Sequence, residues 1–371
     1  MLSLITSLFL ISNCSFQISI FNEINKLKNG ENLIISPLGI FQLLSLTANG
    51  AKGTTQQEML ETLQSESISE LNEINYSLLN LFKTFTTVEV ANSIMAKFEL
   101  LSSFSEIAEK YESPVEKLES VEQVNNWCSK KTHGKITEII DELKDEILMV
   151  LLNAVYFKGE WTYKFENITT QLKSFYNFGT NEIKTDTMFQ LSHFQYYEDS
   201  NVQVVDLPYT EDGMSALIIL PKSDIDINNY INKLWNKENN DIKSIIKKLS
   251  YSKVRLELPK FELNFKLSLN EVLKNAGIFS AFTDYADFSG LKKDGGIKID
   301  EVIHKTYLKV NEGGTEAAAI TYGGTVGTTS IPVEEVIYEM KINRPFLFLL
   351  RSNKLPENYD LLFMAKIEEL K

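Results

Sequence analysis

The spacing of hydrophobic positions predicts helices and strands along most of the chain. From Phe16 to Leu27, apolar residues recur near helical spacing, and Gly30 is predicted to end this helix. Met149–Phe157 is almost continuously apolar, which is typical of a strand buried on both faces at the centre of a sheet. Residues 228–249 have a helical pattern with a Lys-rich polar face. Together these patterns predict a fold of class α+β.

Local signals refine the starts of several elements. Ser or Thr followed three positions later by Gln or Glu is typical of the start of a helix, and this pattern occurs at Thr54, Ser120 and Ser268. Residues 32–36 are predicted to form a short strand that ends at a proline turn, and a buried helix is predicted to follow it as far as Gly50.

The stretch that begins at residue 303 changes character in its middle. Residues 303–310 alternate as a strand does, so that successive side chains face opposite sides. After them, every second residue is small: Thr315, Ala317, Ala319, Thr321, Gly323, Thr325 and Gly327. One face of this stretch could therefore lie beneath close-packed neighbours, although its Gly and Ala content gives it little tendency to form a strand alone. A flexible Gly/Thr/Ala linker is the alternative interpretation.

Composition narrows the class of protein. The chain has 371 residues, of which 43% are hydrophobic, so it can bury a large core. No linker rich in Pro, Gly or Ser divides it, and a single domain over residues 16–371 is expected. The net charge of −13 disfavours nucleic acid and anionic membranes as partners. No apolar run is long enough to span a bilayer.

The N-terminal segment bears on location. Residues 1–15 are uncharged and mostly apolar, which predicts a signal peptide and a secreted protein. The segment has no basic start, so the alternative is an uncleaved first helix and a cytoplasmic protein. With only Cys14 and Cys128, no disulfide framework is expected. If the chain is secreted, Asn75 and Asn167 are glycosylation acceptors, because each begins an Asn-x-Ser/Thr triplet.

Signatures of catalysis are absent from the sequence. It contains no G-x-S-x-G elbow, no H-E-x-x-H zinc pattern, no phosphate-binding loop and no G-x-G-x-x-G. The few cysteines and the three separated histidines disfavour a metal site, and no pair of carboxylates stands out. His304 taken alone is expected to be a buried structural histidine. The protein is therefore predicted not to be an enzyme, and no cofactor is expected.

Four runs resemble signatures of the serpins, a family of protease inhibitors, and they occur in that family's order. The runs are NLIISPLGI from residue 32, VNNWCSKKTHGKI from residue 124, LLNAVYFKGEW from residue 151 and NEGGTEAAAIT from residue 311. The resemblance extends from about Phe16 to Leu370. It implies a serpin fold, with a large central β-sheet, smaller sheets, surrounding helices and an exposed reactive-centre loop.

The resemblance also implies roles for particular residues. Ser36, Asn153 and His304 correspond to the shutter, a buried cluster whose hydrogen bonds hold the central sheet closed. Trp161 corresponds to the breach, where the loop starts to enter the sheet. Gly39 stands where the family usually has a second serine, which puts part of the shutter's hydrogen bonding in doubt. The hinge of the loop comprises Glu312, Gly313, Gly314, Thr315, Glu316, Ala317, Ala318 and Ala319.

The implied activity is suicide inhibition of a protease. The protease attacks the loop, remains attached as an acyl-enzyme and is carried along when the loop inserts into the central sheet. Counting seventeen residues from Glu312 places the reactive bond at Thr328–Thr329, and a bond a few residues away, for instance after Ser330, is the alternative. The implied partner is a protease held in a covalent complex with a monomeric inhibitor.

The loop composition predicts the class of target. Residues 313–340 contain no Lys or Arg, which excludes the basic residue that a trypsin-like pocket requires. Small residues favour an elastase-like target, whereas Tyr322 and Met340 leave a chymotrypsin-like target open. Residues 54–82 contain five Glu and no Lys or Arg, which disfavours heparin as an activator. A non-inhibitory serpin and an inhibitor of cysteine proteases remain as alternatives.

Overall fold

The computed structural model describes residues 15–235, 241–315 and 335–371. Its α-helices are α1 (Phe16–Leu27), α2 (Pro37–Gly50), α3 (Gly53–Thr62), α4 (Ile68–Phe82), α5 (Ser102–Lys110), α6 (Val121–Lys131), α7 (Ile227–Leu234), α8 (Asp241–Lys248) and α9 (Asn270–Ala276), with 3-10 turns η1 (Asn167–Thr169) and η2 (Ser280–Phe282). None of these helices is long and apolar enough to cross a membrane.

Strands make up the rest of the framework. They are β1 (Leu33–Ile35), β2 (Val88–Ala96), β3 (Val115–Lys117), β4 (Met149–Phe157), β5 (Gly159–Glu160), β6 (Gln171–Asn177), β7 (Asn181–Glu198), β8 (Val202–Pro208), β9 (Met214–Pro221), β10 (Ser250–Pro259), β11 (Phe261–Ser268), β12 (Glu301–Asn311), β13 (Gly314–Thr315), β14 (Ile337–Lys341), β15 (Phe346–Ser352) and β16 (Leu361–Ile367). The mixture of helices and largely antiparallel sheets confirms the predicted α+β class.

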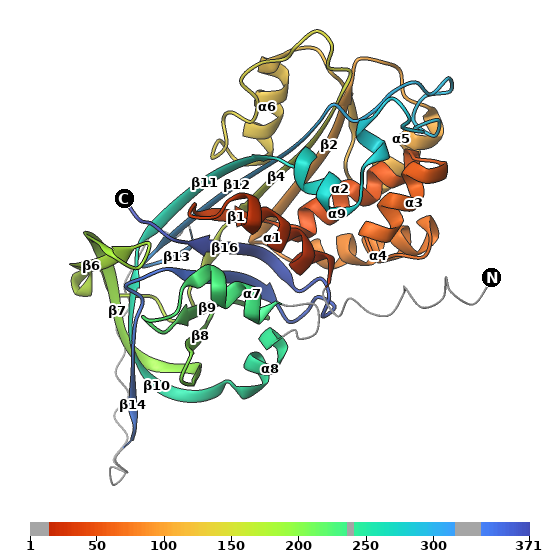
Figure 1. The fold of residues 1–371 in the computed structure, drawn as a ribbon. Helices are drawn as coiled ribbons and strands as arrows, with labels where there is room; N and C mark the ends of the chain where they lie inside the picture. Colours follow the sequence, from red (N-terminus) through yellow and green to blue (C-terminus); the bar gives the residue numbers. More distant parts are fainter. Residues whose placement is uncertain (1–14, 236–240, 316–334) are drawn as a thin grey trace, which may run out of the picture.

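Two sheets organise the described chain (Figure 1). One has nine strands in the order β1-β16-β15-β9-β8-β7-β10-β14, with β6 paired to β7. The predicted smaller sheets are joined here because β7, which is 18 residues long, pairs with strands on both sides. The other sheet has seven strands in the order β3-β2-β4-β12-β13-β5, with β11 paired to β12. This second sheet carries the candidate site.

The pairing of β4 with β12 decides how the central sheet could change. These two strands lie side by side and parallel, with Glu301 opposite Val150 and Tyr307 opposite Tyr156. Their other neighbours, β2 and β11, are antiparallel to them. Parallel pairing is slightly less stable per residue than antiparallel pairing. An additional antiparallel strand could therefore enter the sheet between β4 and β12 and make the sheet more stable.

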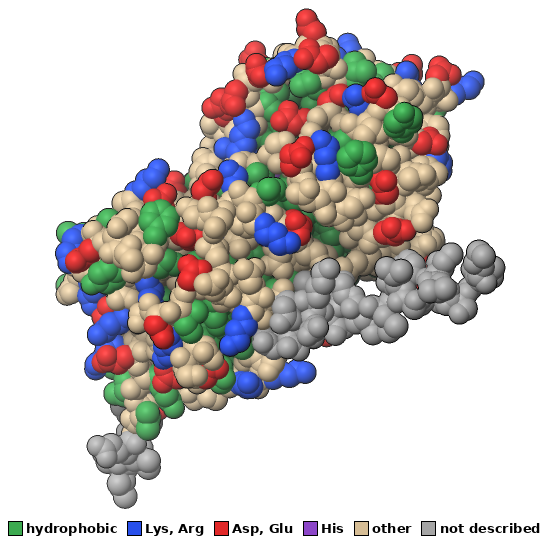
Figure 2. Space-filling model, in the orientation of Figure 1, with side chains coloured by type: hydrophobic (Ala, Val, Ile, Leu, Met, Phe, Trp, Pro, Cys, Tyr) green, Lys and Arg blue, Asp and Glu red, His purple; other side chains and the backbone are tan. Residues whose placement is uncertain are grey.

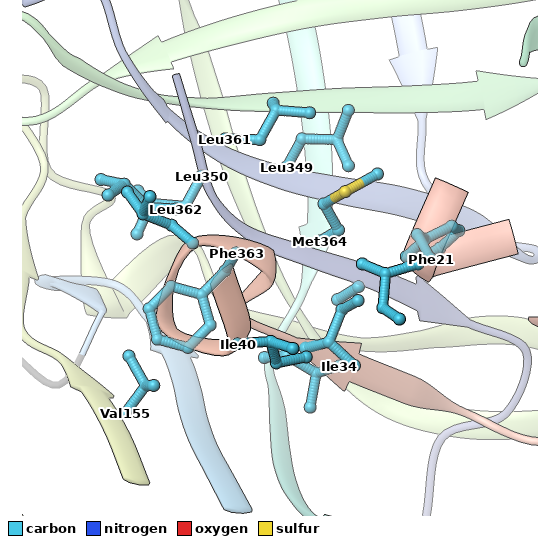
Figure 3. Packing of buried hydrophobic residues seen from close by; sticks show 14 of the residues in the cluster. Phe21, Ile34, Ile40, Val155, Leu349, Leu350, Leu361, Leu362, Phe363 and Met364 are labelled. Carbon is cyan, nitrogen blue, oxygen red and sulfur yellow. The ribbon is translucent and has the colours of Figure 1, made fainter. Parts of the chain in front are cut away.

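Helix α2 lies between the two sheets and is buried along its whole length. It contacts β2 and β4 of the central sheet and β16 of the other sheet. Figure 3 shows how Ile40 of this helix, Val155 of β4 and Phe363 of β16 belong to one packed cluster. A second, smaller cluster packs α6 against the opposite face of β4 and β12. Burial on both faces explains why Met149–Phe157 is apolar at every position except Asn153.

The sequence predicted most of these elements, with two kinds of error. Residues 228–249 do not form one helix, because α7 ends at Leu234 and α8 begins at Asp241. Ser120 caps α6 as predicted, since its hydroxyl accepts a hydrogen bond from the backbone N–H of Gln123. The predicted caps Thr54 and Ser268 are wrong, because α3 and α9 begin at neighbouring positions without a side-chain cap.

Candidate functional site

The predicted shutter residues are brought together beneath the central sheet. Ser36 caps α2, His304 lies on β12, and Asn153 lies opposite His304 on β4. All three are buried. The backbone N–H of Ser36 donates to Nε2 of His304 at 3.1 Å, and Nδ1 of His304 lies 2.6 Å from Oδ1 of Asn153. The three residues therefore lie in one buried, hydrogen-bonded group, and their shutter role stays a prediction.

The hydrogen bonds fix the protonation state of His304. Because its Nε2 accepts from the Ser36 N–H, the ring proton must be on Nδ1, which then donates to Asn153. The ring is fully buried, and this burial lowers the pKa of His304 to about 3, so the imidazole is neutral at ordinary pH. A neutral histidine with a fixed tautomer suits a structural link and does not suit a general base.

Asn92 completes this network and was missed by the sequence analysis. Nδ2 of Asn153 donates to Oδ1 of Asn92 on β2 at 2.6 Å, so the chain of hydrogen bonds joins α2, β12, β4 and β2. Two residues further along β12, the hydroxyl of Thr306 donates to the backbone oxygen of Ile34 at 2.9 Å. The signal for Asn92 was a polar Asn-Ser pair within the mostly apolar run from Val90 to Ala96.

Gly39 does not weaken the shutter. A Cβ atom at Gly39 would lie 2.6 Å from Nδ2 and 2.9 Å from Oδ1 of Asn153. The bare Cα of glycine thus leaves room for the amide that links His304 to Asn92. The backbone N–H of Gly39 donates to the hydroxyl of Ser36 at 3.3 Å. The expectation that Gly39 puts this hydrogen bonding in doubt is therefore wrong.

Acidification should destabilise the protein through His304. The folded pKa is about 3 and the usual value is 6.5, so below pH 6.5 the unfolded chain binds a proton that the folded chain does not. The contribution of His304 to the free energy of unfolding is fully present above pH 6.5 and declines as the pH falls towards 3. We expect a loss of about 2 kcal/mol between pH 6.5 and pH 4.5, measured as the difference between urea unfolding curves.

The variant His304→Gln isolates this contribution. It should be less stable than the parent at pH 7, and its stability should depend less steeply on pH over the same interval. Other buried groups such as Asp360, whose pKa burial raises to about 6, titrate in both proteins and cancel in the comparison. Equal pH dependence in the two proteins would contradict the assignment.

The hinge starts where β12 turns back on itself. The backbone oxygens of Asn311, Glu312 and Gly313 each accept a hydrogen bond from the segment after β5. The donors are the indole Nε1 of Trp161, the backbone N–H of Phe165 and the backbone N–H of Trp161, each at 3.0 Å. Trp161 therefore holds the first residues of the hinge with both its side chain and its backbone, and its role as the breach tryptophan stays a prediction.

Two hinge residues already lie within the central sheet. Gly314 and Thr315 form β13, which pairs antiparallel with Val310 and Asn311 of β12 on one side and with β5 on the other. Gly314 has a φ of +146°, and a Cβ atom there would lie 2.1 Å from the backbone oxygen of Gly159. Only glycine fits this position, because a side chain would collide with the neighbouring backbone.

Thr315 is fully buried and has a specific partner. Its hydroxyl lies 2.7 Å from the phenolic oxygen of Tyr209. The ring of Tyr209 stacks on Trp161, with a centroid distance of 4.4 Å and an interplanar angle of 18°. Gly159 leaves room for this ring, since a Cβ there would lie 2.7 Å from Tyr209 Cδ1. Tyr209 thus contacts both Thr315 and Trp161, and the sequence analysis did not assign it to the site.

Glu312 anchors the base of the hinge through its carboxylate. The side chain is buried, and Oε1 accepts a hydrogen bond from the Thr170 hydroxyl at 2.8 Å and lies 3.3 Å from Nζ of Lys260. Burial tends to raise the pKa of Glu312, but hydrogen bonds from its own backbone, Thr170 and Lys260 lower it overall. Glu312 is therefore ionised and bound to Thr170, just before β6, and to Lys260, between β10 and β11.

The whole chain was matched against known proteins. The family model "Serpin (serine protease inhibitor)" matches residues 11–370. The chain therefore belongs to the serpin family. It is 31% identical to human Serpin B8 over 363 residues, which cover 92% of the chain and 95% of the human protein. It is 32% identical to Intracellular coagulation inhibitor 2 of Tachypleus tridentatus over 364 residues, which cover 93% and 87% of the two chains.

Solved structures agree with this assignment. The crystal structure of tengpin, a thermophilic serpin in the native state, superposes with a TM-score of 0.86 at 31% identity, covering 98% of this chain and 95% of tengpin. This serpin accordingly has the serpin fold that the sequence predicted. Serpins are generally serine protease inhibitors rather than enzymes, and they act on target proteases, although some members do not inhibit.

Several predicted site residues of this serpin lie outside the described residues. They are Glu316, Ala317, Ala318, Ala319, Thr328 and Thr329, together with residues 1–14 of the predicted signal peptide. Met340, proposed as a residue that a chymotrypsin-like protease could recognise, is wrong for that role. It is fully buried on β14, opposite Leu256 of β10.

The two glycosylation triplets differ in accessibility. Asn75 is fully buried in α4, and its Nδ2 donates to the backbone oxygen of Leu71 at 2.8 Å. A glycan on this nitrogen has no space in the folded protein, so the structure argues against Asn75. Asn167 is exposed in η1 and remains a proposed acceptor. Among the described residues, no group of three or more His, Cys, Asp or Glu side chains could hold a metal ion.

Proposed function

We propose that this serpin inhibits serine proteases by loop cleavage, acyl-enzyme trapping and insertion of the loop between β4 and β12. The observation that carries the proposal is the position of β13. Gly314 and Thr315 already pair with β12 on one side and with β5, the continuation of β4, on the other. The loop therefore starts from a hairpin that points along the boundary between the two central strands.

Extension of this pairing assigns a place to each loop residue. Thr315 lies opposite Val310 of β12 and Gly159 of β5, and each further loop residue would face the preceding residue of both neighbours. Thr321 would then reach the position between His304 and Asn153, which are opposite each other in the closed sheet. The pairing extended along β12 and the pairing extended along β5 and β4 therefore agree in register at this position. This agreement supports insertion as one continuous strand.

The side-chain pattern of the loop fits this register. Residues of the same parity as Thr315, such as Ala317 and Ala319, would face the core between the sheets, where their small size avoids collisions. Residues of the other parity would face α6, and Tyr322 would lie between Ile303 and Leu152 of the second cluster. Glu316 would lie between Lys309 and Lys158, whose positive charges would stabilise its carboxylate.

Insertion would replace the parallel pairing of β4 with β12 by two antiparallel pairings, one on each side of the new strand. The strand would run antiparallel to both β4 and β12, which are parallel to each other. Each new ladder hydrogen bond contributes about 0.5–1.5 kcal/mol, so roughly a dozen residues are needed to move an attached protease. The burial of apolar side chains such as Ile320 and Tyr322 adds to this driving force.

The chemical step requires only the protease. Its serine oxygen forms a bond to the carbonyl carbon of Thr328, the bond to the nitrogen of Thr329 breaks, and that nitrogen leaves as an amine with the proton from the serine. The inhibitor stays bound as an ester. Insertion then separates this ester from the new N-terminus before water can hydrolyse it.

Denaturing electrophoresis tests the proposal. The protein is mixed in turn with neutrophil elastase, chymotrypsin, trypsin and a cysteine protease. A heat- and detergent-resistant band at the summed mass is expected with elastase or chymotrypsin and not with trypsin. Complexes with the cysteine protease alone would favour the second candidate target class, and cleavage of the loop without any complex would favour a non-inhibitory serpin.

Replacement of Thr328 by Arg should redirect the inhibitor. The segment from residue 313 to 340 has no Lys or Arg, so a trypsin-like pocket finds no basic side chain in the parent. In Thr328→Arg we expect the rate of trypsin inhibition to rise by roughly a hundredfold or more. Rate constants are measured from progress curves, and the mass of the released fragment locates the bond. Val326→Arg is the matched control. Stronger trypsin inhibition by this variant would indicate that the reactive bond follows residue 326 and not residue 328.

The remaining parts of the proposal concern location and partners. We place the mature protein outside the cell, with residues 1–15 removed and Asn167 glycosylated. A cytoplasmic protein that retains the segment is the alternative, and the relative from Tachypleus tridentatus is named as intracellular. The protein acts as a monomer that forms a 1:1 complex. Helices α3 and α4 contain no Lys or Arg, so heparin is not proposed as an activator.

A further inference from the structure

The turn between α1 and β1 contains an asparagine followed by a glycine. The sequence has two such Asn-Gly pairs, Asn29–Gly30 and Asn49–Gly50. In an Asn-Gly pair the backbone nitrogen of glycine can attack the side-chain carbonyl carbon of asparagine, because glycine has no side chain to hinder the approach. The two pairs lie in opposite environments, and this difference decides which of them can react.

The first pair is exposed and lies in an open turn. Asn29 and Gly30 are the two central residues of this turn, which is closed by the backbone N–H of Glu31 donating to the backbone oxygen of Lys28 at 3.2 Å. Gly30 has a φ of +77°, typical of the third residue of a type II turn, and a Cβ atom there would have no neighbour within 4 Å. Within the described residues, neither the Asn29 amide nor the Gly30 N–H forms a hydrogen bond, so no contact holds them apart.

The second pair is enclosed and held in a helix. Asn49 is 8% exposed, and its Nδ2 donates to the backbone oxygen of Ser45 at 2.9 Å and to Oδ1 of Asn72 at 3.0 Å. Gly50 is buried as the last residue of α2. A Cβ atom at Gly50 would lie 2.4 Å from the Leu291 side chain, so the backbone has no room to rearrange. Asn49–Gly50 therefore serves as an internal reference for Asn29–Gly30.

The reaction at the exposed pair needs only water. The Gly30 nitrogen forms a bond to Cγ of Asn29, and the side-chain nitrogen leaves as ammonia with the proton from Gly30. Water then opens the resulting five-membered succinimide at either of its carbonyl carbons. One opening gives aspartate. The other gives isoaspartate, in which the main chain passes through Cβ and Cγ and is longer by one carbon atom.

A longer main chain matters here because the turn is anchored on both sides. Before the turn, the backbone oxygen of Lys28 accepts a hydrogen bond from Nζ of Lys366 at 3.4 Å. After it, Oδ1 of Asn32 accepts from the backbone N–H groups of Glu368 and Glu369, at 2.7 and 3.0 Å. One additional carbon atom between the two anchors changes their separation, so both cannot keep their present geometry.

Lys366 is sensitive to the loss of an anchor. Its side chain on β16 is fully buried and forms an ion pair with Glu368. Nζ of Lys366 also donates to Oδ1 of Asn228 at 2.9 Å. A buried ammonium group needs hydrogen-bond partners for all its protons, because each missing partner leaves charge that water no longer solvates. Displacement of the Lys28 oxygen therefore weakens the packing of the α1–β1 turn on β16.

The new carboxylate alone is a small change. Helix α1 lies on the side of the molecule that faces the viewer in Figure 1, and Figure 2 shows positive and negative side chains interspersed on that side. Lys28 already pairs with Glu31 at 3.0 Å. One more exposed charge on such a surface contributes little to stability. The effect of the reaction therefore comes from the lengthened backbone.

We propose that Asn29 is a site of spontaneous deamidation, and that its conversion to isoaspartate loosens the contacts of the α1–β1 turn with residues 366–369. This inference does not rest on protease inhibition. It assigns to the folded protein a slow covalent change that requires no enzyme and occurs at one of the two Asn-Gly pairs.

Peptide mapping tests the site. The folded protein is incubated at mildly alkaline pH and body temperature, and a protease that cuts after glutamate then separates the two pairs, because Glu31 lies between them. Deamidation raises the mass of a peptide by about 1 Da. We expect the Asn29 peptide to change at least about tenfold faster than the Asn49 peptide, since Asn49 reacts only after local opening. In urea the two rates should be similar. Equal rates in the folded protein, or no reaction at Asn29, would overturn the proposal.

Unfolding rates test the consequence. Ion exchange isolates the incubated fraction with one additional negative charge, and a methyltransferase specific for isoaspartate measures its isoaspartate content. We expect the isoaspartate form to unfold in urea roughly fivefold faster than the parent, as the loss of one hydrogen bond predicts.

Two variants at the same position are the matched controls. Freshly purified Asn29→Asp carries the new charge on a backbone of normal length, and it should unfold at the parent rate. Asn29→Gln cannot form the five-membered ring, and it should gain no charge during the same incubation. An isoaspartate form that unfolds no faster than Asn29→Asp would overturn the loosening of the turn.

Discussion

The substitution Thr315→Arg should abolish inhibition while leaving the loop cleavable. Thr315 is fully buried in the central sheet, beside Tyr209 and between β12 and β5. Burial of an unpaired charge costs several kcal/mol, so an arginine at this position should displace the hinge from the sheet, and insertion of the cleaved loop would then have to bury that charge. If the barrier to insertion rises by about 3 kcal/mol, insertion slows roughly a hundredfold. The acyl-enzyme then hydrolyses first, and the inhibitor behaves as a substrate.

The measurement is the number of inhibitor molecules consumed per protease molecule trapped. We expect this number to rise at least tenfold in Thr315→Arg, with the loop fragment still released. Thr315→Ser is the control, since it keeps the hydroxyl that contacts Tyr209 and remains small. Undiminished trapping by the arginine variant would rule out insertion of the hinge along β12.

Asn153→Leu should be strongly destabilising although the two side chains have the same number of heavy atoms and both branch at Cγ. Asn153 accepts from Nδ1 of His304 and donates to Oδ1 of Asn92, and all three side chains are buried. Leucine leaves a donor on His304 and an acceptor on Asn92 without partners, and each such loss costs about 1–3 kcal/mol. We therefore expect a loss of roughly 2–5 kcal/mol in the free energy of unfolding, measured by urea denaturation.

Asn92→Ala provides an internal comparison. Asn92 is the last member of the network, so its removal leaves only Nδ2 of Asn153 unpaired. The loss of stability should be about half of that in Asn153→Leu. An equal loss in the two variants, or none in either, would show that the network does not hold β2, β4 and β12 together. A selective loss at Asn153 supports its central position between the strands.

A non-inhibitory role is the main competing interpretation of the fold. Within the serpin family, some members share the architecture without trapping proteases. The small residues at alternate positions from Thr315 to Gly327 favour insertion, since large or charged side chains there would prevent it. The predicted effect of Thr315→Arg therefore separates the two interpretations, because a protein that never inserts its loop has no trapping to lose.

The hydrophobic pattern determined the framework of this protein. Met149–Phe157 was predicted as a buried central strand and is β4, with the same bounds. This succeeds because a strand covered on both faces can hold few polar residues, so its limits are visible in the sequence. The region 228–249 shows the opposite case, where one helical period continues through two helices, α7 and α8. Periodicity alone does not reveal such a break.

Resemblance to known runs identified the hinge, Ser36, Asn153, His304 and Trp161, but it did not provide their partners. Asn92 and Tyr209 become site residues only because β2 pairs with β4 and because the Trp161 ring stacks on Tyr209. Such contacts join residues far apart in the chain, and no local spacing records them. Only the tertiary structure explains why glycine fits at position 39: the Asn153 amide occupies the space where a Cβ atom would lie.

The sequence by itself determined which residues of the loop are small and which strands are buried, because these depend on side-chain size and polarity along one segment. The tertiary structure decided the pairing of β4 with β12, the position of Thr315 between them and the burial of Asn75. The physical reason is that register and burial depend on how separate segments pack together, and the same local pattern is compatible with more than one packing arrangement.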